Sequence, residues 1–212
     1  MSRFIFLDID GVLNSADTIS RDVGPFASAG EHRLSMLDLG MCVRFAGLLY
    51  AAPDARVVLS STWRLLHTAQ EMAALIVKKL TDGGHSGAAD AIKQAIVDGV
   101  VVPRFIGRTG ETALMGTLRR TMGRGCEIQA WLEVFTPDPL AQHVAILDDD
   151  SDMGLMSVAH VATSWMTGLL PEHCTAVLEK LSHPLSALPG FEGLSERTQL
   201  RAPGDCCEGV AP

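Results

Sequence analysis

The chain has 212 residues and a formal net charge of −8, and 47% of its residues are hydrophobic. This length fits one domain of ordinary size, and the apolar content is sufficient for a core, so disorder of the whole chain is excluded. The acidic charge argues against a protein that coats nucleic acid, because such binding requires a basic surface. It leaves room for an enzyme that touches a strand end through a local cluster of arginines.

Neither the cysteines nor the apolar runs point to secretion or to a membrane. The five cysteines lack the spacing of a zinc site or a disulfide framework, which indicates a reducing compartment. The apolar run before Asp8 is too short for a signal peptide, and no run approaches the roughly 20 apolar residues that span a bilayer. We expect a soluble, cytoplasmic protein without a membrane contact. The sequence indicates no protein partner.

Short apolar runs closed by polar residues alternate along the chain with stretches of helical periodicity. In chain order they predict a strand at 4–7, a helix at 34–51, a strand at 56–59, helices at 68–80, 89–97 and 127–135, strands at 143–147 and 160–163, and a helix at 171–181. This alternation is typical of an α/β fold with a doubly wound parallel sheet. Such sheets carry their sites at the carboxyl ends of the strands.

The pattern predicts a single domain over 1–183. We interpret 15–55 and 65–123 as modest insertions that form at most small caps. Residues 184–212 are rich in Pro, Gly and Ser without periodicity, which predicts a loose C-terminal tail.

The first candidate motif follows the first strand and contains Asp8, Asp10 and Gly11. A carboxylate can attack phosphorus when a divalent cation neutralises the phosphate. A second carboxylate two residues later can protonate the leaving oxygen and then activate water. Gly11 permits a sharp turn and is a candidate phosphate-binding residue. The plain alternative is an Asp-rich turn or helix cap.

The second motif follows the second strand, where Ser60 and Ser61 precede Trp63 and Arg64. Hydroxyls and backbone N–H groups at such a strand end can cradle a phosphoryl group, although the same residues also make an ordinary helix cap. Trp63 and Arg64 add a ring and a guanidinium that could hold a nucleobase or a second phosphate. Trp63 is as readily explained by packing.

The third motif places four acids within five positions after the predicted strand 143–147: Asp148, Asp149, Asp150 and Asp152. Such acids repel one another without a cation, and Mg²⁺ prefers oxygen ligands, so one or two of them together with Asp8 would suffice. The alternative is a solvated acidic turn.

Phosphoryl transfer also requires a cation beside the transferred group. Arg124, which precedes the predicted helix 127–135, is the leading candidate, with Arg119 and Arg120 as rivals. A surface role for Arg124 stays open. Arg104 and Arg108, again with Arg119 and Arg120, are candidates to line the approach, and a solvent-exposed role is as well supported for each.

These motifs together resemble the haloacid dehalogenase (HAD) superfamily. Asp8-x-Asp10-Gly11-Val12-Leu13 resembles its first motif, Ser60 its second and Asp148-Asp149 its acidic fourth. Arg124 lies where that superfamily has its third-motif cation. More narrowly, Ser60–Arg64, the stretch Arg124–Leu132 and Leu147–Asp150 resemble the branch found in Swiss Army Knife RNA-repair proteins.

The resemblance implies a Rossmann-like core with Asp8 as nucleophile and Asp10 as general acid and base. It implies Mg²⁺ held by Asp8, the Asp10 backbone carbonyl and Asp149. Asp148 stands where the usual fourth motif often has a Gly, so the choice between Asp148 and Asp149 is open. We favour Asp149 and rank Asp152 third.

The predicted function is therefore a magnesium-dependent phosphatase that cleaves a phosphate monoester through an aspartyl-phosphate. The expected substrate is a phosphorylated small molecule, a nucleotide or a nucleic-acid end. Two alternatives remain at this point: a non-catalytic phosphate-binding or regulatory module, and a phosphotransferase with an acceptor other than water. The seven histidines show no ligand spacing.

Overall fold

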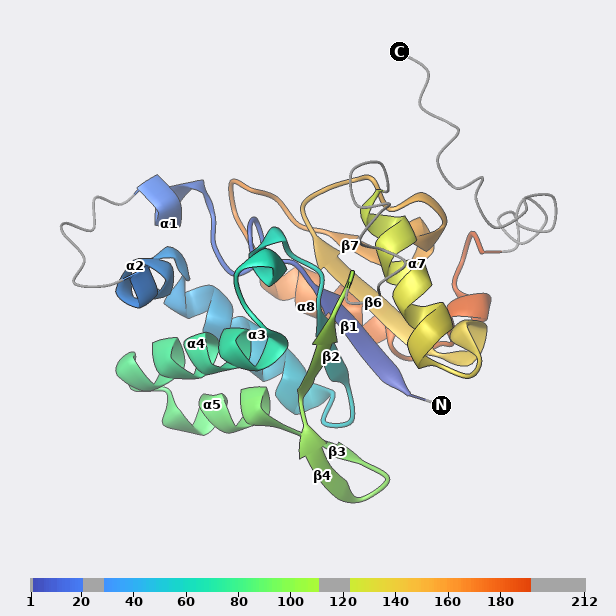
Figure 1. The fold of residues 1–212 in the computed structure, drawn as a ribbon, viewed down its shortest axis with the longest axis horizontal. Coiled ribbons are helices and arrows are strands. Elements are labelled where there is room, and N and C mark those ends of the chain that lie inside the picture. The colour runs from blue at the N-terminus through green and yellow to red at the C-terminus, as the bar shows by residue number, and fades with distance from the viewer. Residues whose placement is uncertain (1, 21–28, 111–122, 192–212) are drawn as a thin grey trace, which may run out of the picture.

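A computed structural model describes residues 2–20, 29–110 and 123–191. Within them, five parallel strands form the main sheet in the order β5-β2-β1-β6-β7 (Figure 1). These strands are β1 (Arg3–Leu7), β2 (Arg56–Leu59), β5 (Phe105–Arg108), β6 (His143–Asp148) and β7 (His160–Ala162). The predicted α/β fold with a parallel sheet is confirmed.

Helices and 3-10 turns connect the strands. The helices are α1 (Ala16–Ser20), α2 (Ala29–Met36), α3 (Leu39–Ala51), α4 (Ala69–Asp82), α5 (Ser86–Lys93), α7 (Arg124–Phe135) and α8 (Pro171–Lys180). The 3-10 turns are η1 (Thr62–Leu65), η2 (Pro139–Ala141), η3 (Gly154–Ala159) and η4 (Leu185–Ala187). Figure 1 shows α7 on the opposite side of the sheet from α3 and α8.

The side chains of β1 alternate between two hydrophobic cores, as a strand buried on both faces requires. Ile5 and Leu7 pack with α3, α4, α5 and α8. Phe4 and Phe6 pack with α7, and both rings make T-shaped contacts with Trp131 at centroid distances of 5.5 Å. Burial of each such side chain contributes about 1.5–3 kcal/mol, so β1 is fixed at the centre of the sheet.

The single helix predicted over 34–51 is wrong, because the chain breaks there into α2 and α3. The break lies at Leu37 and Asp38. Asp38 adopts an extended backbone, and its side chain accepts a hydrogen bond from the Met41 N–H at 3.0 Å. Aspartate satisfies a free N–H better at a helix start than in a helix interior, so Asp38 begins a new helix.

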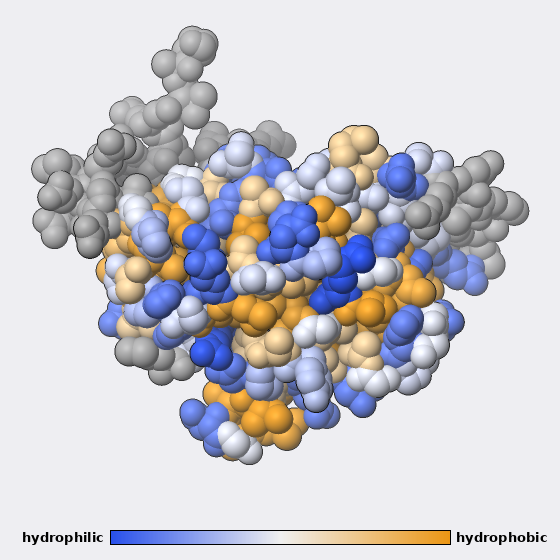
Figure 2. Space-filling view, turned by 180° about the vertical axis from the view of Figure 1, so that it is seen from behind, coloured by the Kyte–Doolittle hydropathy of each residue, from blue (hydrophilic) through white to orange (hydrophobic). Residues whose placement is uncertain are grey.

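The helix predicted over 89–97 is wrong in its second half. The helix α5 ends at Lys93, and the chain continues as β3 (Gln94–Val97), which pairs antiparallel with β4 (Val100–Pro103). The turn between them is Asp98-Gly99, and both residues have positive φ. Two such residues form the hairpin turn that matches strand twist. Figure 2 shows hydrophobic side chains over this hairpin, where Ile96, Val100 and Val101 are exposed.

Two other predicted boundaries differ from the structure. The interval 65–123, expected to be an insertion, supplies β5 to the edge of the main sheet. The tail expected from residue 184 begins later, because Leu185 and Leu188 are buried in the core beneath α7. The remainder of the predicted tail, 192–212, lies outside the described residues.

Among the described residues, the helices are all too short or too polar to cross a bilayer.

Candidate active site

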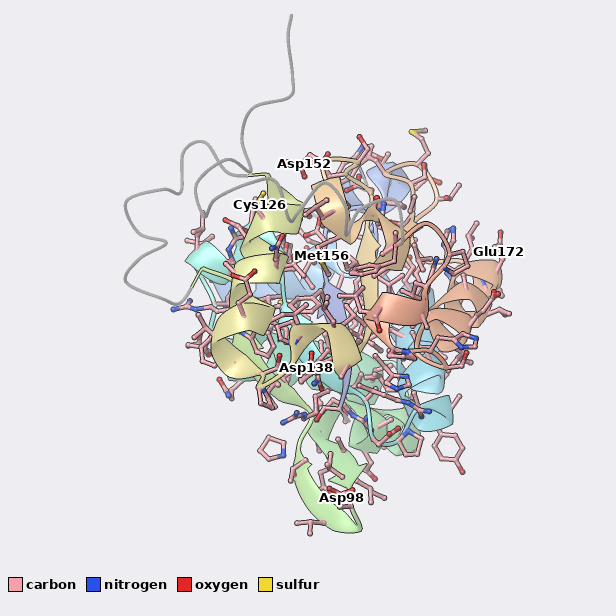
Figure 3. All side chains as sticks on the ribbon, turned by 90° about the vertical axis from the view of Figure 1, so that its right-hand side faces the viewer. Asp98, Cys126, Asp138, Asp152, Met156 and Glu172 are labelled. Atoms are coloured by element: carbon pink, nitrogen blue, oxygen red, sulfur yellow. The ribbon has the colours of Figure 1, made fainter. Side chains whose placement is uncertain are left out.

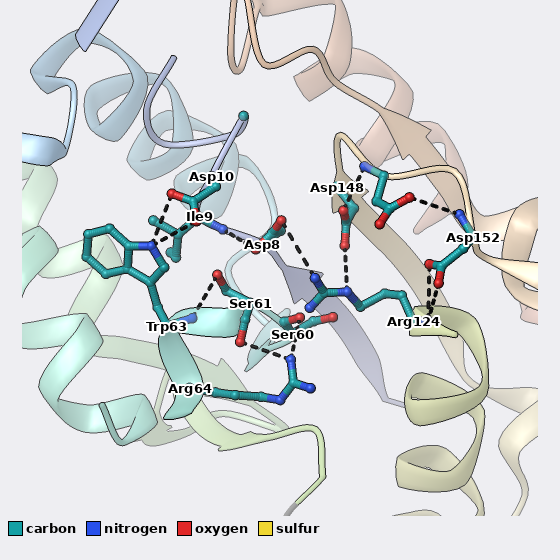
Figure 4. A network of polar contacts seen from close by, with 12 residues as sticks. Asp8, Ile9, Asp10, Ser60, Ser61, Trp63, Arg64, Arg124, Asp148 and Asp152 are labelled. Carbon is teal, nitrogen blue, oxygen red and sulfur yellow. Dashed lines mark hydrogen bonds and ion pairs between the residues drawn. The ribbon is translucent and has the colours of Figure 1, made fainter. Parts of the chain in front are cut away.

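Three parallel strands bring the first three predicted motifs to one edge of the sheet. In the sheet register, Leu7 of β1 is opposite both Leu59 of β2 and Leu147 of β6. Asp8 and Ser60 each come one residue later. The Asp8 N–H donates to the Leu147 carbonyl at 2.9 Å, and the Ser60 N–H donates to the Leu7 carbonyl at 2.8 Å. Pairing of the strands therefore carries these side chains to a common place (Figure 4).

The carboxylates of Asp8, Asp148 and Asp149 converge there. Each offers one oxygen, and these oxygens all lie within 4.8 Å of one another. Asp8 and Asp148 are buried. Burial is the main cause that raises the pKa of Asp8, of Asp148 and of Asp149, and the charge of Asp148 raises the pKa of Asp8 further. A divalent cation that takes oxygen ligands would relieve this accumulation of negative charge.

Gly11 allows the first motif to approach the loop 148–152, which lies at the carboxyl end of β6 and contains four aspartates (the acidic loop). Its φ is +67°, and a Cβ at this position would overlap the carboxylate of Asp149. A side chain at residue 11 would thus displace one member of the acidic cluster. The requirement for glycine here is both conformational and steric.

Arg124, the predicted cation, faces two of the three carboxylates. Its Nε lies 3.3 Å from Asp148 Oδ2, and its Nη2 lies 4.0 Å from Asp8 Oδ2. Its Nη1 is buried and has no hydrogen-bond partner among the described residues. The rival candidates Arg119 and Arg120 lie outside the described part of the chain.

The start of α7 is held against the acidic loop, which fixes Arg124. The Asp152 carboxylate accepts the Arg124 backbone N–H at 3.1 Å from each oxygen. A Cβ on Gly125 would overlap the Met153 backbone. Figure 3 shows Asp152 near the start of α7, far from Asp98 at the tip of the hairpin. Asp152 therefore acts as a helix cap. As a candidate metal ligand Asp152 keeps its place below Asp148 and Asp149, since its carboxylate is outside the cluster and accepts the Arg124 N–H.

The two serines of the second motif differ in their bonding. Ser60 is fully buried, and its Oγ has no hydrogen-bond partner among the described residues. The Ser61 Oγ accepts the Trp63 N–H at 3.3 Å, and a contact from this hydroxyl lowers the pKa of Asp8. A buried hydroxyl without a partner is uncommon in a folded protein and indicates a place for a ligand atom.

Asp10, the second aspartate of the first motif, is outside the three-carboxylate cluster. Its side chain instead accepts hydrogen bonds from Trp63 and Asn14. Trp63 is buried, so its ring is not offered to a base. This arrangement was not foreseen from the sequence, which gave Trp63 no definite role and Asn14 none.

The Arg64 guanidinium is occupied by contacts within the protein, which differs from the predicted role of phosphate binding. Its Nη2 lies 2.7 Å from both carboxylate oxygens of Glu127 on α7. Its Nη1 donates to the backbone carbonyls of Ser60 and Ser61 at 3.2 and 3.0 Å. Both side chains of the pair are nearly buried. Arg64 thus connects the loop that contains Ser60 and Ser61 (the serine loop) to α7, the helix that carries Arg124. The nearly buried ion pair with Glu127 is sufficient to explain an arginine at this position.

Arg104 was one of the arginines predicted to line the approach to the active site, and this prediction is wrong. It is buried and precedes β5, at the amino edge of the sheet and opposite to the carboxylates. Its guanidinium donates to backbone carbonyls there, so it is part of the frame. Arg108 is at the end of β5 and donates to the carbonyls of Arg64 and His67 at 2.6 and 3.2 Å.

The fold and this site define a class: an α/β domain with an acidic cluster and a facing arginine at the carboxyl edge of a parallel sheet. A family model described as the HAD domain in Swiss Army Knife RNA repair proteins matches residues 4–174. The chain therefore belongs to this HAD domain family, and membership indicates phosphohydrolase chemistry. The match extends from β1 into α8 and includes every site residue described above. Comparisons with curated proteins and with solved structures give no match.

Proposed function

We propose that this protein is a Mg²⁺-dependent phosphatase that cleaves a phosphate monoester through a phosphorylated Asp8. The observation that carries the proposal is the convergence of three carboxylates within 4.8 Å of one another, with Arg124 facing two of them. A buried cluster of this kind, beside a hydroxyl without a partner, suits a cation and a phosphoryl group better than it suits protein stability.

The donor set fits magnesium, which takes carboxylate and carbonyl oxygens. Asp8 and Asp149 would hold the ion, with the Asp10 backbone carbonyl as the family resemblance implies. Asp148 is less suited, because its Oδ1 accepts the Asp150 N–H at 2.9 Å and its Oδ2 faces Arg124. When bound, the ion supplies positive charge that offsets the charge of the phosphate.

In the proposed reaction, an Asp8 carboxylate oxygen bonds to phosphorus while the bond from phosphorus to the ester oxygen breaks. Asp10 gives a proton to the departing oxygen. Asp10 then takes a proton from water, whose oxygen attacks phosphorus and releases phosphate and the Asp8 carboxylate. Arg124 and the Ser60 hydroxyl would bind the phosphoryl oxygens, where negative charge accumulates in the transition state.

We propose a nucleotide or the phosphorylated end of a nucleic acid as the substrate. Support comes from the description of the family, which concerns RNA repair proteins. The net charge of −8 favours a nucleotide or a short end over a long polymer, since a long polyanion would be repelled.

The experiment measures hydrolysis of a chromogenic phosphate monoester with Mg²⁺ and with a chelator, for the wild type, Asp8→Asn and Asp10→Asn. Metal-dependent turnover is expected in the wild type and nearly complete loss in both variants. Activity that survives in Asp8→Asn would refute the nucleophile. A panel of nucleotides, end-phosphorylated oligonucleotides, sugar phosphates and amino-acid phosphates then tests the substrate. Cleavage of the sugar and amino-acid phosphates alone would refute the nucleotide proposal.

A further inference from the structure

We propose that Trp63 and Asn14 are positioning residues that hold the carboxylate of Asp10 and leave its Oδ2 to transfer the proton. This inference rests on the proposed function and deepens it. It gives the second motif a task beyond phosphate binding, because a residue of that motif orients the acid of the first motif.

The contacts involve both oxygens of Asp10. The Trp63 Nε1–H lies 3.1 Å from Oδ1 and 3.1 Å from Oδ2, and the Asn14 Nδ2 donates to Oδ1 at 2.9 Å. Figure 4 shows the indole beside Asp10, next to Ser61. Trp63 is 8% exposed and Asn14 is 0% exposed, so water does not compete freely for either donor.

The orientation of the Asn14 amide is set by a second hydrogen bond. Its Oδ1 accepts the Gly11 backbone N–H at 3.0 Å. Because a backbone N–H can only donate, the carbonyl oxygen of Asn14 must face Gly11, and the NH₂ group must face Asp10. The same side chain thus holds both the turn at Gly11 and the carboxylate of Asp10.

The position of Trp63 is set by the serine loop, which the proposed function assigns to phosphate binding. It lies in η1, which begins directly after Ser61, and its own N–H is accepted by the Ser61 Oγ. A shift of the serine loop would therefore carry the indole away from Asp10. This geometry joins phosphate binding and proton transfer through one short segment.

Trp131 shows what a tryptophan used only for packing looks like in this protein. It is 5% exposed, and its ring meets Phe4 and Phe6. Its Nε1 has no hydrogen-bond partner among the described residues. The two buried indoles differ chiefly in that Trp63 donates to a carboxylate, which makes Trp131 a matched control.

The contacts also distinguish the two oxygens of Asp10. Oδ1 receives hydrogen bonds from Trp63 and Asn14, whereas Oδ2 receives only that of Trp63 within the described part of the chain. A carboxylate oxygen has two lone pairs, so Oδ2 keeps more capacity for the proton. With Oδ1 held on two sides, rotation of the carboxylate is restricted and Oδ2 stays in one direction.

The test compares Trp63→Phe with Trp131→Phe on two esters. A nucleoside monophosphate has a poor alkoxide leaving group that needs a proton, whereas dinitrophenyl phosphate has a good leaving group that does not. We expect Trp63→Phe to lower kcat/KM for the nucleotide roughly 10- to 100-fold, as misplacement of a general acid does. For dinitrophenyl phosphate we expect kcat/KM to change by about threefold or less, because its leaving group does not need a proton. Trp131→Phe should change both esters equally.

Asp10→Asn supplies the second half of the test. If Trp63 acts through Asp10, Trp63→Phe should cause no further ester-selective loss of the first-turnover rate in the Asp10→Asn background, where steady-state turnover is nearly absent. Asn14→Leu, which removes the other donor, should show the same ester preference and covers the case in which Trp63→Phe does not fold. Equal loss on both esters, or no loss, would overturn the positioning role. A wild type without metal-dependent turnover would instead refute the proposed function, and this inference with it.

Discussion

An arginine lies at each of two opposite edges of the main sheet, Arg104 buried and Arg124 nearly buried, and the two make different contacts. At the amino edge, Arg104 donates to backbone carbonyls at distances of 2.6–3.1 Å; the acceptors belong to Ala52, Pro53, Ala55 and Ala91. At the carboxyl edge, Arg124 faces the carboxylates of Asp8 and Asp148, and its Nη1 has no hydrogen-bond partner within the described residues.

The difference separates an arginine that holds the frame from one that is available to a ligand. Fixed carbonyls use the donors of Arg104, and its desolvation by burial lowers its pKa to about 10. Arg124 keeps unused donors in a buried place, which natural proteins rarely tolerate without a reason. Arg124 thus keeps donors that could serve the proposed phosphoryl group, whereas the donors of Arg104 are used by the protein itself.

Replacement of Arg124 should give the largest effect on the reaction. Arg124→Met removes the cation that faces the transferred group, and loss of one such group costs on the order of 10²–10³-fold in kcat. Steady-state rates on a nucleotide, measured at saturating Mg²⁺, provide the test. A kcat within a few-fold of the wild type would show that another residue supplies this charge, and Arg119 and Arg120 would be examined next.

Arg104→Met should lower the stability of the protein and leave kcat unchanged, in contrast to Arg124→Met. Four backbone carbonyls lose a donor, although those of Ala52 and Pro53 still accept the N–H groups of Ala55 and Ile96. Because a buried carbonyl left without a partner costs about 1–3 kcal/mol, we expect the free energy of unfolding to fall by roughly 2 kcal/mol or more. The kcat of the folded fraction should be unchanged, because the residue is at the opposite edge. Urea unfolding and rates at low temperature measure the two quantities. A selective loss of kcat would contradict the division between the edges.

The sequence was sufficient for four of the five strands of the main sheet and for the position of the acids, because both follow from strands that end in polar residues, but it did not predict β5. Asp8, Ser60 and Asp148 were found in this way. The partners of Asp10 and Arg64 were not, because Trp63 and Glu127 reach across elements distant in sequence. The hairpin turn was missed although Asp98-Gly99 between β-branched residues is a strong local signal. The helical periodicity over 89–97 points to a helix instead, because it continues past the last turn of α5.

The ion pair between Arg64 and Glu127 should contribute to stability at the carboxyl edge, as Arg104 does at the amino edge. Glu127→Gln leaves a nearly buried guanidinium without its charged partner, which should lower the free energy of unfolding by roughly 1–3 kcal/mol. Because Glu127 is one turn beyond Arg124, we expect kcat to fall less than in Arg124→Met. Urea unfolding measures the first quantity. Arg64→Met combined with Glu127→Leu should recover part of the stability, and a double variant as unstable as the sum of its parts would argue against a direct pair.

Metal-free protein should lose stability as the pH rises. Burial raises the pKa of Asp8, Asp148 and Asp149 above the ordinary range of aspartate. Between the ordinary value and the raised value, the folded state binds more protons than the unfolded state. Stability contributed by these groups is therefore full at pH below about 4 and is lost as the pH rises toward neutrality, by about 1.4 kcal/mol for each unit of raised pKa.

Thermal unfolding in a chelator, followed from pH 5 to pH 8, measures this loss, and Mg²⁺ added at each pH completes the test. Because a cation competes with protons for the same carboxylates, the rise in Tm on addition of Mg²⁺ should grow with pH. Asp8→Asn should flatten both dependences, since an amide does not titrate. Asp138→Asn serves as a control at a carboxylate that caps η2, which precedes the amino end of β6, whereas the acidic cluster lies at the carboxyl end of that strand. If the rise in Tm were the same at pH 5 and pH 8, the ion would be binding elsewhere, and the carboxyl edge would lose its claim to be the metal site.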